Sequence, residues 1–212
     1  MSGRIKGVVF GPDGTLLDSI YIHTEAWRVA LERNGFFADR EKIVHFFGIA
    51  PPKLLRFVAG EINDKILEKI ETDYTKEVRA RVNEVHAFPD SKEALWNLKK
   101  SGIKCAVASL NDLETAELML DEAGILDSVD AIVGSDEVTF GRPDPDIFLE
   151  GFRRIGVNPS MGAVVGHTEY DALSARKINA FSIIIRRDGT LVKSAELVFR
   201  SLRDAIAEIV AD

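Results

Sequence analysis

Five short apolar runs, separated by segments with helical patterns, constrain the fold of this chain most strongly. They are Val8–Phe10, Lys104–Ala108, Ala131–Val133, Ala163–Val165 and Phe181–Ile185. Each is rich in small or β-branched residues and is apolar on successive positions, as expected of strands buried on both faces of a parallel sheet. Alternation of such strands with helices predicts an α/β fold with a Rossmann-like, doubly wound parallel sheet.

Start and stop signals delimit the helices expected between these runs. Asp90 stands three residues before Glu93, and Asn111 stands three before Glu114, which is the spacing of a capping box. The remaining helices of the sheet are expected at Pro143–Ile155, at Tyr170–Ile178 and, from helical spacing, at Val198, Leu202, Ile206 and Ile209.

The segment between the first and second runs differs from the rest because it contains no convincing strand. Apolar residues at helical spacing mark one helix from Ile20, a second opened by Pro51 and a third or fourth within 62–82. The simplest interpretation is an α-helical cap inserted after the first strand. We therefore expect a core formed by residues 1–17 and 86–212 and a cap formed by residues 18–85; a chain of 212 residues is long enough for both.

Charge and cysteine content limit the partners and the compartment. The net charge of −7 argues against nucleic acid or an anionic membrane as a partner. The single cysteine, Cys105, lies in an apolar run, so we expect a buried thiol and no internal disulfide. The apolar run near the N-terminus is too short for a signal-peptide core, and none approaches the roughly 20 residues of a membrane span. We expect a cytoplasmic protein.

Four of the expected strands end in recognisable polar segments, at residues 8–19, 106–109, 140–148 and 164–172. Together, in this order and with the helical insertion after the first, they resemble the four motifs of the haloacid dehalogenase superfamily. The closest similarity is to the branch that contains β-phosphoglucomutase and phosphoglycolate phosphatase. The resemblance covers essentially the whole chain and implies the same fold.

The resemblance also implies a chemistry against which this chain can be compared. In the family, a carboxylate at the end of the first strand attacks phosphorus, and a second carboxylate two residues later acts as general acid and base. A hydroxyl after the second strand binds phosphoryl oxygens, a lysine of the third motif offsets negative charge, and aspartates of the fourth motif help to hold Mg²⁺.

This sequence departs from that pattern at three catalytic positions. The nucleophile position is Gly11, the lysine position is Arg142, and the leading aspartate of the fourth motif is His167. The positions of the second carboxylate, the hydroxyl and the later acid are kept as Asp13, Ser109 and Asp171. Glycine carries no side chain that could form a covalent intermediate. The joint occurrence of the three departures therefore indicates a catalytically silent relative.

The same departures predict a changed ligand. Two carboxylates are missing, which leaves Asp13 and Asp171 opposite Arg142 and a His167 that protonation would make positive. We therefore expect no resident Mg²⁺ or other cofactor, because Mg²⁺ prefers oxygen ligands. A small phosphorylated molecule or an inorganic anion would bind instead, through Ser109, Arg142 and Asn111, without turnover.

Cap residues offer weaker signals. His23 and Trp27 lie in the first cap helix, where Trp27 suits the interior of the cap and His23 either faces the cleft or solvent. Lys53 and Arg56 lie in a segment where similar proteins select substrates, although they would also suit an ordinary charged surface.

Three functions remain open at this point. The first is a silent phosphatase homologue that binds an anion or a protein partner in the old cleft. The second is an active hydrolase on a small phosphorylated metabolite, with Asp13 or His167 as nucleophile or with Asp13 activating a water. The third is a regulatory subunit that uses its cap as an interaction surface.

Overall fold

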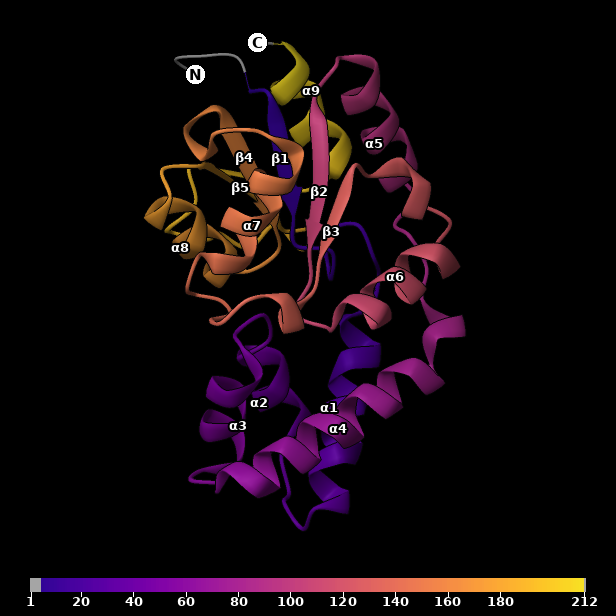
Figure 1. Cartoon of the computed structure of the whole chain (residues 1–212), viewed down its shortest axis with the longest axis vertical. Coiled ribbons are helices and arrows are strands. Elements are labelled where there is room, and N and C mark those ends of the chain that lie inside the picture. Colours follow the sequence, from indigo (N-terminus) through magenta and orange to yellow (C-terminus); the bar gives the residue numbers. More distant parts are fainter. Residues whose placement is uncertain (1–4, 212) are drawn as a thin grey trace.

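A six-stranded, fully parallel sheet forms the centre of the molecule (Figure 1). The computed structural model describes residues 5–211. The strand order is β3-β2-β1-β4-β5-β6, so β1 occupies the middle of the sheet and the connections run outward in both directions. The strands are β1 (Gly7–Phe10), β2 (Lys104–Ala108), β3 (Ala131–Val133), β4 (Gly162–Gly166), β5 (Phe181–Ile185) and β6 (Leu197–Phe199).

Helices cover both faces of the sheet, which explains why the strands are apolar on successive residues. On one face α7 (Asp146–Ile155) and α8 (Glu169–Lys177) pack over β1–β5, while α5 (Ser91–Lys100) and α9 (Leu202–Ala211) pack on the other. Val8 belongs to one hydrophobic cluster and Val9 to the other, and both are fully buried. The expected doubly wound α/β fold is therefore confirmed.

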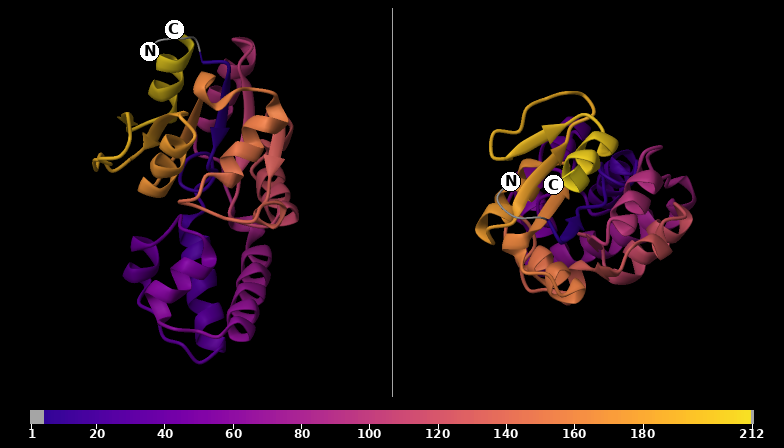
Figure 2. Two further views of the ribbon diagram at one scale, coloured as in Figure 1. Left: turned by 60° about the vertical axis from the view of Figure 1, so that its left-hand side comes forward. Right: turned by 90° about the horizontal axis from the view of Figure 1, so that it is seen from above.

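Helices α1–α4, which we call the cap, lie at the end of the sheet opposite both termini (Figures 1 and 2). They lie between β1 and α5 in the sequence, as the missing strands predicted. Two backbone hydrogen bonds join the segment that leaves the core to the segment that returns to it. The N–H of Asp18 donates to the carbonyl of His86 (2.9 Å), and the N–H of Phe88 donates to the carbonyl of Leu16 (3.0 Å). The cap helices are α1 (Ile20–Arg33), α2 (Arg40–His45), α3 (Pro51–Ala59) and α4 (Asp64–Ala80).

The C-terminal segment corrects one prediction. Val198 was expected in the last helix, but it lies in β6 and pairs in register with Ile184 of β5. Helix α9 begins only at Leu202. Helical spacing misassigned Val198 because β6 has only three residues, which are too few to display the alternation of a strand.

Both expected capping boxes also differ from the structure. The N-cap of α6 (Leu113–Glu122) is Asp112, whose carboxylate accepts from Thr115, and Asn111 is free for other contacts. Asp90 makes no capping bond to α5 and instead accepts from the backbone N–H of Leu202 and from Arg187. Both side chains serve contacts between distant segments, which local spacing does not reveal.

Short 3₁₀ turns complete the connections: η1 (Val82–Glu84), η2 (Leu126–Ser128), η3 (Ser135–Glu137) and η4 (Pro159–Met161). Within the described part of the chain, no helix is long and apolar enough to cross a membrane. The expected division of the chain at residues 17 and 85 stays a prediction.

Candidate functional site

Gly11 is the first residue after the central strand, at the edge of the sheet that the cap covers. Its backbone N–H donates to Val165 (2.9 Å), which continues the β1–β4 ladder. A Cβ placed on Gly11 would lie 3.0 Å from Oδ1 of Asp171 and 3.1 Å from Nη1 of Arg142. These are tight contacts, so two oppositely charged side chains already fill the space next to Gly11.

The ion pair between Arg142 and Asp171 is buried on both sides. Arg142 is 5% exposed and Asp171 is 1% exposed, and Nη1 donates to Oδ1. Oδ2 of Asp171 accepts three further bonds, from the backbone N–H of His167 (3.1 Å) and from Thr168 N (2.9 Å) and Oγ1 (2.8 Å). Asp171 is thus both the counterion of Arg142 and part of the capping box that begins α8.

These contacts fix the charge of Asp171. Burial acts to raise the pKa of its carboxyl, but the positive charge of Arg142 and the hydrogen bonds from Thr168 outweigh it and leave the pKa below the ordinary value. Nε of Arg142 is buried and has no hydrogen-bond partner. The pair therefore satisfies the carboxylate fully and the guanidinium only in part.

Asp13 occupies the other side of the site and is held by the cap. Its Oδ1 accepts hydrogen bonds from Oγ of Ser19 (2.6 Å), the residue just before α1, and from Nε2 of His23 (2.8 Å), within α1. Burial acts to raise the pKa of Asp13, while His23, Ser19 and Arg142 together bring it below the ordinary value. His23 thus faces the cleft rather than solvent.

Tyr74 extends this contact into a chain of buried hydrogen bonds. Its hydroxyl lies 2.8 Å from Nδ1 of His23 and donates to Oδ1 of Asn111 (3.2 Å). Its ring stacks on Trp27 with centroids 3.8 Å apart, which confirms Trp27 as an interior residue of the cap. Burial, followed by the charge of Asp13, raises the pKa of Tyr74 well above its ordinary value, so the phenol stays protonated.

The chain ends at the hydroxyl of Ser109. Ser109 Oγ accepts from the backbone N–H of Asn111 (3.1 Å) and from its Nδ2 (3.3 Å). The structure therefore places Asp13, His23, Asn111 and Ser109 along one buried network beside Arg142. The motifs assigned no role to Ser19, Tyr74 or Thr168.

Tyr74 carried a detectable signal in the sequence. It is the single aromatic residue of α4, a helix otherwise dominated by charged side chains. An isolated aromatic side chain on such a helix indicates a buried contact. Ser19 and Thr168 carried no comparable signal, because serine and threonine at helix N-termini are common for local reasons.

His167 points away from the other candidates and corrects an expectation. Its ring packs against Gly14, where an added Cβ would lie 2.7 Å from the ring, and its Nδ1 donates to the carbonyl of Ile185 (3.0 Å). Burial lowers the pKa of His167 below the ordinary value, so the ring is neutral near pH 7. The structure therefore does not favour a protonated His167 beside Arg142.

The space inside the site is small. A cavity of about 20 Å³ is bounded by Asp13, His23, Tyr74, Asn111 and Arg142, among other residues. That volume suits about one water molecule. A phosphate group has no room there while the cap holds this position.

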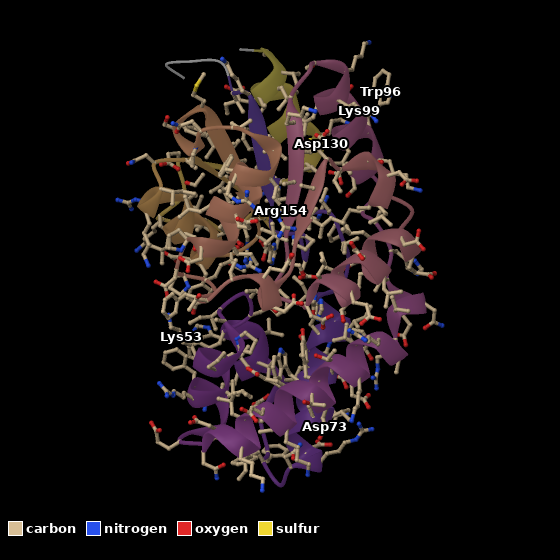
Figure 3. All side chains as sticks on the ribbon, viewed as in Figure 1. Lys53, Asp73, Trp96, Lys99, Asp130 and Arg154 are labelled. Atoms are coloured by element: carbon tan, nitrogen blue, oxygen red, sulfur yellow. The ribbon has the colours of Figure 1, made fainter. Side chains whose placement is uncertain are left out.

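A larger cavity, about 450 Å³, lies next to it between the cap and the core. We call it the interface cavity. Tyr74 and Asn111 form part of the wall between the two spaces, and the lining of the interface cavity also includes Lys53 and Arg56 of α3. Lys53 lies at the junction of cap and core (Figure 3), where its Nζ donates to Asp144 (2.9 Å). The two cap cations therefore face this cavity and not Arg142.

The side chains beside Gly11 do not fit the Mg²⁺ site of the resembled family. Gly11 offers no carboxylate, one oxygen of Asp171 binds Arg142, and the other accepts three hydrogen bonds. Among residues 5–211, no group of three or more His, Cys, Asp or Glu side chains is arranged to hold a metal. The expectation that this chain has no resident Mg²⁺ stays a prediction, supported by this donor set.

Fold and site geometry together define an α/β protein with a helical cap over the carboxyl ends of its parallel strands. The sequence profile of haloacid dehalogenase-like hydrolases matches residues 8–185, so the chain belongs to that family.

Similar proteins fall in the branch expected from the motifs. The chain is 26% identical to β-phosphoglucomutase of Bacillus subtilis, over 97% of this chain and 94% of that protein. It is 29% identical to hexitol phosphatase A of Escherichia coli, over 94% and 92% of the two chains. The crystal structure of a hydrolase from Pseudomonas syringae superposes with a TM-score of 0.88 and 25% identity, covering 97% of this chain and 98% of that one.

Proposed function

We propose that this chain is a catalytically silent phosphatase homologue that binds a small phosphate-type anion between its cap and its core. The observation that carries the proposal is the Arg142–Asp171 ion pair, which fills the space beside Gly11. In the resembled enzymes, this space belongs to the attacking carboxylate. A carboxylate is absent here, and the cation of the third motif is bound to the acid of the fourth.

The energetics support silence rather than slow catalysis. Loss of a covalent nucleophile reduces turnover by roughly 10⁴ to 10⁶ in enzymes whose catalytic groups act as a unit. A substrate phosphate that displaced Asp171 from Arg142 would also leave a buried carboxylate without its counterion, which costs about 3–5 kcal/mol for similar pairs. Substrate binding at Arg142 is therefore strongly disfavoured.

We therefore propose that the anion binds in the interface cavity. Arg56 lines that cavity and forms no ion pair with any residue in the range 5–211, whereas Lys53 is paired with Asp144. A guanidinium is a good bidentate ligand for phosphate. This shifts the anion from Arg142, where the motifs had placed it, to Arg56, while Asn111 remains in the wall of the cavity.

Calorimetry with inorganic phosphate in the presence of a chelator tests anion binding. We expect saturable heat with the unmodified chain and its loss in Arg56→Gln. Lys99→Gln, an exposed change on α5 far from the cavity (Figure 3), is the matched control and should bind as before. Equal binding by Arg56→Gln would contradict the proposed position, and absence of heat in every variant would contradict anion binding itself.

One observation favours a second function, an active hydrolase on a small phosphorylated metabolite. The 2.8 Å hydrogen bond between His23 and Asp13 is a carboxylate–imidazole pair of the kind that can activate water. The test is turnover of para-nitrophenyl phosphate with Mg²⁺, Mn²⁺ or Co²⁺. Turnover that Asp13→Ala abolishes would establish this second function and end the case for silence.

A further inference from the structure

One face of α3 and one face of α4, both in the cap, line the interface cavity. Lys53 and Arg56 are three residues apart on α3, and Glu71, Tyr74 and Thr75 recur at helical spacing on α4. Loops of the core close the opposite side, with Ser135 and Thr139 among their residues. The cavity thus has cationic, anionic and hydroxyl groups in its walls.

Most of these charges are already paired. Lys53 donates to Asp144 (2.9 Å), which also accepts from Lys177 (3.0 Å). Asp112 accepts from Arg79 of α4 (2.7 Å). The lining acids Asp112 and Asp144 and the lining cation Lys53 therefore already have partners of opposite charge.

Two lining residues of opposite sign are left over. Neither Arg56 nor Glu71 forms an ion pair with any residue that the structure describes. Burial, together with the charge of Glu68, raises the pKa of Glu71 above its ordinary value, so its carboxylate gains from a cation placed beside it. The cavity therefore offers one site for an anion and one for a cation.

We infer that the interface cavity binds a small zwitterionic phosphate ester, with its phosphate at Arg56 and a primary ammonium at Glu71. The cavity volume of about 450 Å³ falls within the range of small-molecule sites. The phosphate half of this inference rests on the proposed function, whereas the ammonium half rests on Glu71. A polyol phosphate, which carries no ammonium group, would leave Glu71 without a partner and should bind less tightly.

Calorimetry with two probes that differ at one group tests the inference. O-Phosphoethanolamine carries an ammonium where 2-hydroxyethyl phosphate carries a hydroxyl, and both present the same phosphate. At low ionic strength we expect the ammonium probe to bind about tenfold more tightly, since one added charge pair in a partly enclosed site is expected to have an effect of that order.

Variants assign the preference to its residue. Glu71→Gln should reduce the preference to about onefold by weakening only the ammonium probe, and Arg56→Gln should weaken both probes. Asp64→Asn is the matched control, because Asp64 is an exposed acid on the same helix that does not line the cavity. Thermal unfolding checks that each variant is folded.

The outcomes separate this inference from the proposed function. Equal binding of the two probes, or a preference that survives Glu71→Gln, overturns the zwitterion and leaves anion binding intact. Absence of binding by both probes overturns both proposals. A tenfold preference that disappears only in Glu71→Gln supports both.

Discussion

At the scale of single residues, Gly11 and Arg142 have to be considered together. Gly11 leaves a space at the end of β1, and the guanidinium of Arg142, bound to Asp171, lies against it. Glycine at this position is not required by the backbone, since Gly11 has no positive φ. A side chain added at Gly11 would instead contact the Arg142–Asp171 ion pair.

Restoring acids at the two altered positions should therefore not restore catalysis. In the double variant Gly11→Asp with His167→Asp, Arg142 would still hold Asp171 and would also attract the new carboxylate. We expect no turnover of para-nitrophenyl phosphate with Mg²⁺. Adding Arg142→Lys, which removes the planar fork, should allow turnover to appear. Activity in the double variant would show that Arg142 does not block the site.

Asp171 supports a prediction about stability. Replacing it by Asn removes the counterion of a buried guanidinium, so Asp171→Asn should lower the unfolding free energy at pH 7 by about 3–5 kcal/mol. The pKa of Asp171 is lowered in the folded chain. Its stabilisation is therefore complete above the unfolded-state value near 3.9 and is lost as the pH falls through the lower folded-state value.

Urea unfolding between pH 3 and 7 measures this difference. The gap between the unmodified chain and Asp171→Asn should be constant above about pH 5 and should narrow below about pH 4. The exposed change Asp127→Asn is the control and should stay within about 0.5 kcal/mol of the unmodified chain. A difference in unfolding free energy that widens as the pH falls would contradict a lowered pKa of Asp171 in the folded chain.

At the scale of elements, α4 is the helix that joins cap to core. Tyr74 reaches Asn111, and Arg79 reaches Asp112 (2.7 Å) and Thr115 (2.8 Å) at the start of α6. The backbone N–H of Ala50, just before α3, also donates to the carbonyl of Arg142 (3.0 Å). Polar contacts therefore fix the cap over the core from two of its helices.

Tyr74→Phe isolates the part played by the buried hydroxyl. The ring can still stack on Trp27, but His23 and Asn111 each lose a partner, so we expect a loss of about 1–3 kcal/mol in unfolding free energy. Hydrogen exchange should rise across α4. Tyr21→Phe removes a hydroxyl from a 54% exposed tyrosine and should change neither quantity. Equal unfolding free energies of the two variants would show that the hydrogen bonds of the Tyr74 hydroxyl do not stabilise the fold.

At the scale of the whole molecule, Asp13 holds the cap on the core. In the resembled enzymes, the acid at this position carries out proton transfer. Asp13 binds His23 of α1, and Arg79 of α4 binds the core independently. An enzyme of this architecture must open its cap to admit substrate. A silent homologue has no such requirement, so its cap contacts can be permanent.

The double variant His23→Ala with Arg79→Ala tests this permanence. Because it removes a contact from each of two cap helices, we expect a larger radius of gyration by small-angle X-ray scattering and faster exchange in α1 and α4. The unmodified chain should keep one radius of gyration with and without phosphate. A radius that falls when phosphate is added would show a cap that opens and closes.

Local patterns in the sequence were sufficient for most of the core. The five apolar runs became β1–β5 because strands buried on both faces must be apolar throughout, whatever the rest of the fold. The position of the cap followed from the segment that lacks strands. The six-residue helix α2 and the strand β6 were missed because elements this short show too little periodicity.

The order of residues along the chain also determined that Gly11 offers no carboxylate, since that depends on one residue and on no contact. Only the tertiary structure decided what surrounds it: the pairing of Arg142 with Asp171, the turn of His167 toward Gly14 and the link from Tyr74 to His23. Those residues are far apart in the sequence, and side chains that meet only through packing leave no spacing pattern between them.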